Sequence, residues 1–88
     1  MFFIQDVSIG SFNANSGNGR AFFHDLGRTV PFHIARDAEP GTKGVLSRSL
    51  DRYANNRPSD VQVHFHKILA ADGFLKRIEI IDANLPED

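Results

Sequence analysis

The stretch Gly19–Arg36, GRAFFHDLGRTVPFHIAR, decides the fold class because it predicts a β-hairpin. Its second half, Val30–Ile34, carries an apolar residue at every second position, which is the period of a strand with one buried face. The turn before it falls at Asp25–Arg28, where Gly27 can adopt a positive φ without steric cost. We therefore expect two antiparallel strands here, within a mainly β protein.

Two adjacent phenylalanines, Phe22 and Phe23, lie in the first half of this hairpin. Neighbouring side chains of a strand point to opposite faces, so one of the two rings is hard to bury. We assign Phe22 to the exposed face. The hairpin is therefore predicted to carry a binding surface of Phe22, His24 and His33, flanked by Arg20, Arg28 and Arg36.

Three further strands are predicted outside the hairpin. The first covers Phe2–Phe12, with Gly10 as the site of a bulge or bend. Another is centred on Val61–His66, where apolar and polar residues alternate. The last covers Phe74–Ile81 and follows Asp72–Gly73, a hairpin-turn signal. The chain is thus expected to contain five strands.

One helix is predicted between the third and fourth strands. Thr42 is expected to cap its N-terminus, and Asn55–Pro58 is expected to end it. Leu46, Leu50 and Tyr53 fall on one side of this helix. We expect that apolar stripe to lie in the core.

This order of three strands, a helix and two strands is the order of an OB-fold. We therefore expect a small five-stranded OB-like Greek-key barrel, mainly β, with one helix between strands three and four. An SH3-like barrel and an open α+β sheet remain alternatives, because the sequence does not fix the strand order. The length of 88 residues suits one domain, residues 1–82, followed by a short acidic tail, residues 83–88.

The composition narrows the classes of function. With no cysteine, the chain has no disulfide, thiolate metal site or cysteine nucleophile, which suits the cytoplasm. No apolar run reaches the roughly 20 residues that span a bilayer, and Asp6 argues against a signal peptide. The formal net charge of −1 gives no strong global field for phosphates. On the predicted helix, Arg48 and Arg52 share a face that could extend a basic patch, although solvation is the favoured interpretation.

Two short stretches resemble cold-shock domains, which are small OB barrels that bind single strands. Phe12–Ala14, followed by Gly17, Gly19 and Phe22, resembles the first aromatic motif of that family. Asp60–Phe65 resembles its second motif, apart from a glutamine in place of the exposed phenylalanine. In that family the motifs lie close together in the sequence, whereas here the predicted helix separates them. In element order and size the chain is also similar to bacterial and phage single-stranded DNA-binding OB proteins.

Such a resemblance implies a surface that holds bases by aromatic stacking, worth roughly 1–3 kcal/mol per base, with basic side chains along the backbone. His64 and His66 share one face of the predicted fourth strand and are included in this surface. The alternative is that Phe22 belongs to a second small core or a dimer seam and that the arginines are solvated. The candidate nucleic-acid-binding residues are Arg20, Phe22, His24, Arg28, His33, Arg36, His64, His66 and Lys76.

The histidines also raise the question of a metal site. His64 and His66, together with His24 or His33, could in principle form a three-histidine site, but a polar or base-binding strand face is the favoured interpretation. The serines and aspartates show no spacing typical of a nucleophile with its base or of paired carboxylates. We therefore predict no metal, no cofactor and no enzymatic activity.

Two hypotheses for the function follow. The first is non-enzymatic binding of single-stranded nucleic acid, DNA rather than RNA, with low sequence specificity and as a homodimer or higher assembly. The second is a protein–protein interaction module, such as a small adaptor or a phage or plasmid accessory protein, that uses the same barrel face. The clustered arginines and the exposed aromatic hairpin favour the first, and the near-zero net charge favours the second. Neither involves a membrane.

Overall fold

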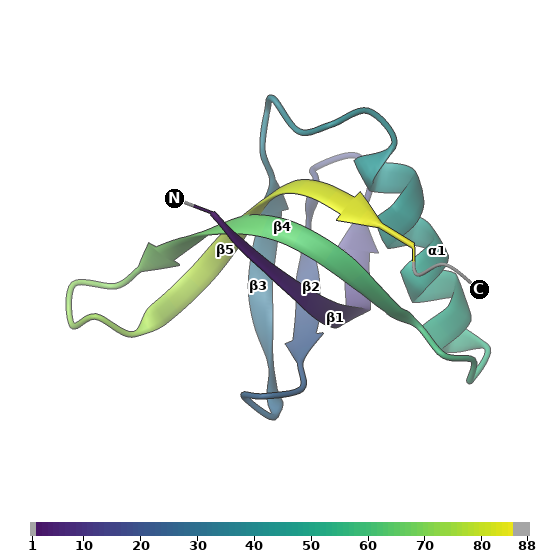
Figure 1. Ribbon diagram of the computed structural model, residues 1–88, viewed down its shortest axis with the longest axis horizontal. Helices are drawn as coiled ribbons and strands as arrows, with labels where there is room; N and C mark the ends of the chain where they lie inside the picture. The colour runs from purple at the N-terminus through teal and green to yellow at the C-terminus, as the bar shows by residue number, and fades with distance from the viewer. Residues whose placement is uncertain (1, 86–88) are drawn as a thin grey trace.

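The computed structural model describes residues 2–85. The helix and strands follow one another as shown in Figure 1, with the bounds β1 (Phe3–Asn13), β2 (Asn18–Phe23), β3 (Arg28–Ile34), α1 (Thr42–Ala54), β4 (Asp60–Leu69) and β5 (Leu75–Asn84). In this described part of the chain, no helix is both long enough and apolar enough to cross a membrane.

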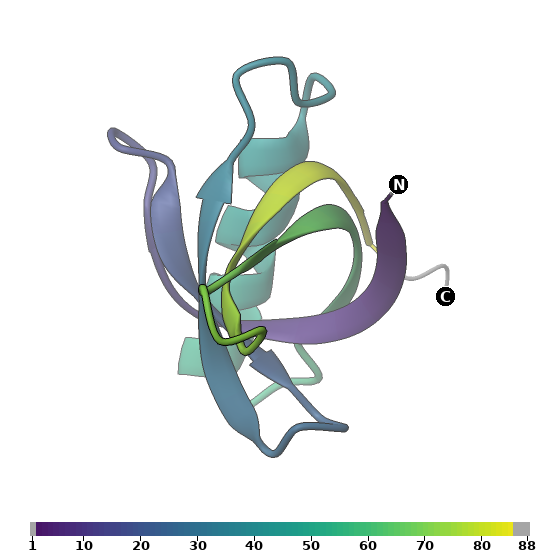
Figure 2. The same ribbon diagram turned by 90° about the vertical axis from the view of Figure 1, so that its left-hand side faces the viewer.

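The strands close into a barrel in the order β1-β2-β3-β5-β4, with β4 pairing back on β1. Neighbouring strands are antiparallel except β3 and β5, which run parallel. Figure 2 looks into the barrel and shows α1 behind it. The β4–β5 hairpin projects at the end opposite α1 (Figure 1). The predicted mainly β, five-stranded OB-like barrel with a helix between the third and fourth strands is confirmed, and the open α+β sheet is ruled out.

The first strand, β1, bends so that it pairs on both sides. Its first half, Phe3–Ser8, pairs with β4, and its second half, Ser8–Asn13, pairs with β2. The register with β2 shifts between Ile9 and Ser11, so Gly10 is the extra residue of a bulge. The bulge that the sequence predicts at Gly10 is therefore confirmed, and it lets one strand pass from one neighbour to the other.

The core fills the interior of the barrel with side chains from every strand and from α1. The predicted alternation in β3 and β4 is confirmed, and Phe23 is buried while Phe22 lies nearer the surface. Phe23 packs edge-on against Phe65, with ring centroids 5.6 Å apart. The buried core side chains include Val7, Ile9, Ala21, Phe23, Val30, Phe32, Ile34, Leu46, Val61, Val63, Phe65, Ile78 and Ile80.

The predicted apolar stripe of α1 lies only partly in the core. Leu46 is fully buried and Leu50 packs partly against the core, but Tyr53 is 56% exposed, so its assignment to the core is wrong. The buried residues of the helix are Thr42, Leu46 and Ser49. Tyr53 continues that stripe by one more turn, beyond the part of the helix that the barrel covers.

Two element boundaries differ from the sequence prediction. Thr42 is the first residue of α1 and not its cap, because Gly41 occupies the N-cap with a φ of 89° that favours glycine. At the other end, β5 continues to Asn84, since Ala83 is buried and pairs with Val63 of β4. The strand thus includes the first two residues of the expected acidic tail, and residues 86–88 lie outside the described residues.

Gly19 and Gly44 offer a matched pair of substitutions. A Cβ at Gly19 would collide with the backbone oxygen of Ser11 and lie 2.5 Å from Cζ of Phe32, whereas a Cβ at Gly44 in α1 meets nothing within 4 Å. We expect Gly19→Ala to lower the free energy of unfolding by about 3 kcal/mol through overpacking. Gly44→Ala should raise it by up to about 1 kcal/mol through helix propensity. Urea denaturation measures both, and a Gly19→Ala protein as stable as the wild type would contradict this close packing.

Candidate functional site

The outer surface of the barrel carries a row of side chains that crosses neighbouring strands. Ser8 of β1 is the register partner of Asp60 in β4 and of Phe22 in β2, and Phe22 is in turn the partner of Thr29 in β3. Paired residues of neighbouring strands point to the same face, and Phe23 points into the core. The row from Asp60 to Thr29 therefore faces outward.

A groove of about 650 Å³ lies over this row. Its floor is the outer face of β1, β2 and β3, with Ser8, Gly10, Phe22 and Thr29. Its wall is the end of α1 together with the α1–β4 loop, with Arg52, Tyr53, Arg57, Pro58 and Ser59. His24 and Asp60 also line it. The groove thus lies between the helix end and the outside of the barrel.

Two aromatic rings line the groove from different elements. Phe22 lies in the floor and is partly exposed, and Tyr53 lies on the wall and is more than half exposed. Arg52 and Arg57 line the same groove. Flat apolar surfaces next to arginine side chains suit a ligand that is both aromatic and anionic.

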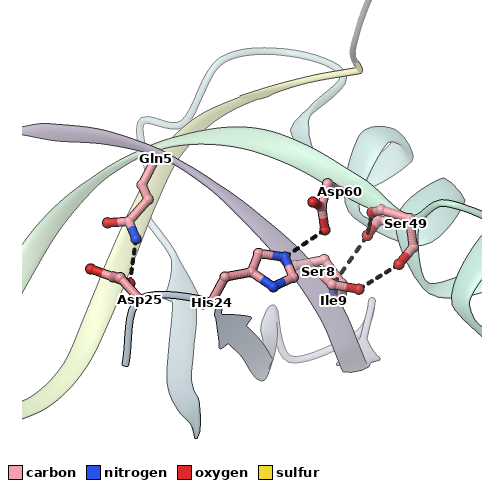
Figure 3. Close-up of polar contacts among 8 residues, drawn as sticks. Gln5, Ser8, Ile9, His24, Asp25, Ser49 and Asp60 are labelled. Atoms are coloured by element: carbon pink, nitrogen blue, oxygen red, sulfur yellow. Dashed lines mark hydrogen bonds and ion pairs between the residues drawn. The ribbon is translucent and has the colours of Figure 1, made fainter. Parts of the chain in front are cut away.

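Two of the groove residues, His24 and Asp60, bond to each other. Nε2 of His24 lies 2.9 Å from Oδ1 of Asp60, and the two side chains face one another in Figure 3. The ring of His24 also packs edge-on against Phe22, with centroids 5.2 Å apart. The side chains of His24 and Asp60 are 54% and 53% exposed, so the bond between them contributes little to stability. Its effect is to orient both groups within the groove.

Ser49 holds the wall of the groove against its floor (Figure 3). This residue of α1 is fully buried, and its hydroxyl accepts the N–H of Ile9 at 3.1 Å and donates to the carbonyl oxygen of Ser59 at 2.6 Å. The hydroxyls of Ser59 and Ser8 also bond to each other. One buried side chain therefore connects α1, β1 and the α1–β4 loop, next to the bulge at Gly10.

The match to a family model covers residues 4–84, which contain the barrel, the helix and the groove. The chain belongs to the family of unknown function DUF7947. No curated protein and no solved structure matches the chain. The function therefore has to be argued from the groove itself.

The predicted hairpin surface lies on the outer face of the β2–β3 hairpin, with Arg20, Phe22, His24 and His33. Of these, Phe22 and His24 line the groove. Arg20 lies beside it, where its Nε donates to Oγ1 of Thr29 at 3.0 Å. His33 lies at the far end of the hairpin, with its Nδ1 2.7 Å from Oδ1 of Asn18. The four residues form one strip along the two strands.

Three of the predicted basic residues lie outside the groove. Arg28 is the register partner of Phe23, so it leaves the hairpin on the side opposite Phe22. Arg36 is exposed after the end of β3. Lys76 is exposed on β5, in the hairpin that projects away from α1 (Figure 1). The structure therefore does not bring these side chains to the groove.

His64 and His66 line a second, smaller hollow. His64 lies four positions along β4 from Asp60, which corresponds to about 13 Å. The ring of His64 stacks on Phe2, with centroids 5.8 Å apart. Acidic side chains that repel phosphate line the same hollow, from Asp37, Glu39 and Asp82. Within residues 2–85, no group of three or more histidine, aspartate or glutamate side chains could hold a metal ion.

The sequence analysis does not predict four of the groove residues as site residues. These are three residues of the wall and Asp60. The sequence pattern assigns Tyr53 to the core and Arg52 to solvent, and it gives Arg57 and Asp60 no role. They come together only because α1 packs against β1 and places its end and the following loop along the groove. The sequence feature that could have indicated this site is a tyrosine in the last helical turn, whose ring carries a polar hydroxyl, with arginines close to it in the sequence.

Ser49→Ala tests the connection between the wall and the floor. The substitution leaves the buried N–H of Ile9 without an acceptor, so we expect the free energy of unfolding to fall by about 1–3 kcal/mol. Ser47→Ala, at an exposed position of the same helix, is the control and should change it by less than about 0.5 kcal/mol. Equal stability of the two variants in urea denaturation would contradict the role given to Ser49.

Proposed function

We propose that the groove binds single-stranded nucleic acid, DNA rather than RNA, without catalysis. The observation that carries this proposal is that Phe22 and Tyr53, on separate elements, line one groove together with Arg52 and Arg57. Bases stack on such rings at roughly 1–3 kcal/mol each, and this stacking tolerates any sequence. Low overall sequence specificity follows from this mode of binding.

The basic residues supply a path for the phosphate backbone. Arg52 and Arg57 line the wall, and Arg20 lies beside the floor on the outer face of β2. Guanidinium groups form forked contacts with phosphates. Because the net charge is −1, attraction of the backbone depends on these local groups. A single strand of nucleic acid that runs along β2 would contact both the aromatic rings and the arginine side chains of the groove.

The shape of the site favours a single strand over a duplex. Proteins commonly read duplex DNA by inserting a helix into its major groove. Here α1 packs on the barrel through Leu46 and Ser49. The rings of the groove can reach only bases that are unpaired. One barrel of this size offers a short site, so we also propose that two copies act together as a homodimer.

A second candidate function is the binding of a protein partner through the same groove. Phe22, Tyr53 and Pro58 give the groove an apolar surface that suits an aromatic or aliphatic anchor residue. The near-zero net charge is also compatible with a protein ligand. The two candidates differ in their response to an oligonucleotide, so one titration separates them.

The first test is fluorescence anisotropy of a labelled mixed-sequence oligonucleotide, single-stranded and duplex, titrated with the protein. We expect selective binding to the single strand, weakened about tenfold by Phe22→Ala through the loss of one stacked base. Phe74→Ala is the matched control, because Phe74 is 74% exposed and does not line the groove. No binding of either oligonucleotide at tens of micromolar would overturn the proposal and favour a protein partner.

The second test is the dependence of binding on salt. Each phosphate contact to a single strand adds about 0.7 to the slope of log K against log salt concentration. Arg57→Gln should therefore reduce that slope by about 0.7, whereas Arg48→Gln, at an exposed position of α1 outside the groove, should leave it unchanged. Equal slopes for both variants would show that Arg57 does not contact the backbone.

A further inference from the structure

We propose that the groove takes up a proton when it binds a single strand, and that His24 carries this proton. This inference rests on the proposed function, because the negative charge of the phosphate backbone is what favours the protonated ring. It makes the affinity of the site depend on pH, with single strands held more tightly in mildly acidic solution than above neutrality.

The ring of His24 is in contact with both Phe22 and Asp60. It packs edge-on against the Phe22 ring, with centroids 5.2 Å apart, and its Nε2 lies 2.9 Å from Oδ1 of Asp60. The side chain of His24 is 54% exposed and lines the groove. A ligand that contacts Phe22 in the groove is therefore close to this ring.

The carboxylate of Asp60 decides which nitrogen of the neutral ring carries the hydrogen. A carboxylate can only accept hydrogen bonds, so Nε2 of His24, which is turned toward it in Figure 3, must donate. In the neutral ring, Nδ1 then has no hydrogen and can only accept. Within residues 2–85, Nδ1 of His24 has no hydrogen-bond partner. An ionised phosphate has no hydrogen to donate to it, so the neutral ring offers the strand backbone no hydrogen bond.

Protonation turns the same ring into a donor that carries a positive charge. Nδ1 gains a hydrogen that a phosphate oxygen can accept, while Nε2 of His24 keeps its bond to Asp60. Hydrogen bonds between charged partners are roughly twice as strong as those between neutral ones. The phosphate stays ionised, and the proton comes from the solvent. The bound strand therefore favours the protonated form of His24.

The charged and titratable groups around His24 come from each element that borders it. Two carboxylates lie on neighbouring strands, and arginines and a tyrosine lie along the groove. Histidine is the one of these side-chain types whose charge ordinarily changes between about pH 5 and 8. A change of affinity in this range therefore reports on His24. The surrounding groups are Asp6 of β1, Arg20 of β2, Asp60 of β4, Arg52 and Tyr53 of α1, and Arg57 of the α1–β4 loop.

The experiment uses fluorescence anisotropy of a labelled oligothymidine at constant ionic strength between about pH 5.5 and 8. Thymine and the phosphodiester groups keep the same charge over this range, so the strand itself does not titrate. We expect the wild-type protein to bind about tenfold more tightly at the acidic end of the range, which is the effect of one added hydrogen bond to a charged group.

Two substitutions of histidine assign this dependence to one ring. His24→Gln keeps a polar side chain that does not titrate, so its affinity should change by less than about twofold over the range. His64→Gln removes a histidine from the second hollow and should keep the wild-type dependence. Circular dichroism checks that both variants are folded.

Asp60→Asn tests the positioning role of the carboxylate. The amide keeps an oxygen that can accept from Nε2 of His24, but it removes the charge that favours the protonated ring. The affinity of this variant should therefore begin to rise at a lower pH than that of the wild type. An unchanged pH profile would show that Asp60 does not act through His24.

Calorimetry measures the proton directly. Binding to the same oligothymidine is followed near neutral pH in two buffers that differ in their enthalpy of ionisation. The wild type should take up part of a proton for each strand bound, and His24→Gln should take up none.

The outcomes separate this inference from the proposed function. Equal affinity of the wild type at both ends of the pH range would overturn proton uptake and leave single-strand binding intact. A pH dependence that survives in His24→Gln would overturn the role of this ring. Absence of binding to every oligonucleotide at every pH would overturn both proposals together.

Discussion

The groove depends on one buried hydroxyl, that of Ser49. The pairing of β1 with β4 ends at Ser8. The N–H of the next residue, Ile9, is buried and has no acceptor on β4. Ser49 supplies the acceptor for this N–H. It also donates to the carbonyl oxygen of Ser59 and so positions the α1–β4 loop. A buried N–H without an acceptor costs about 1–3 kcal/mol. The position of α1 is therefore coupled to the closure of the barrel.

The same constraint shapes the groove. Closure requires β1 to change neighbours, and the bulge at Gly10 makes that possible. Near the bulge, the residues of β1 that line the groove are the small Ser8 and Gly10. Ser49 holds α1 against the barrel, and the last turn of the helix then places Tyr53 in the wall of the groove. The wall and the floor thus both result from how the barrel closes.

The sequence predicts the parts of this protein that depend on local patterns. Alternation along Val30–Ile34 and the glycine signals at Gly10 and Gly27 are local, and the structure confirms the strands, the bulge and the turn. The groove forms where segments that are distant in the sequence pack together. The periodicity of apolar residues does not indicate which segments these are. Tyr53 illustrates the limit, because its spacing matches a buried stripe while the end of the barrel decides its exposure. Asp60 likewise becomes a groove residue only through its pairing with β1.

The charge of the chain decides which interactions can dominate in the proposed complex. A net charge of −1 provides little long-range attraction for a polyanion, and Asp60 adds a negative charge inside the groove. A protein that coats long strands through phosphate contacts would gain from replacing this carboxylate. Beyond its bond to His24, this carboxylate is favoured by a ligand that donates hydrogen bonds to it, as a base edge can and an ionised phosphate cannot. In the proposed complex, the groove is therefore better suited to recognising a few nucleotides by their bases than to covering a strand by charge.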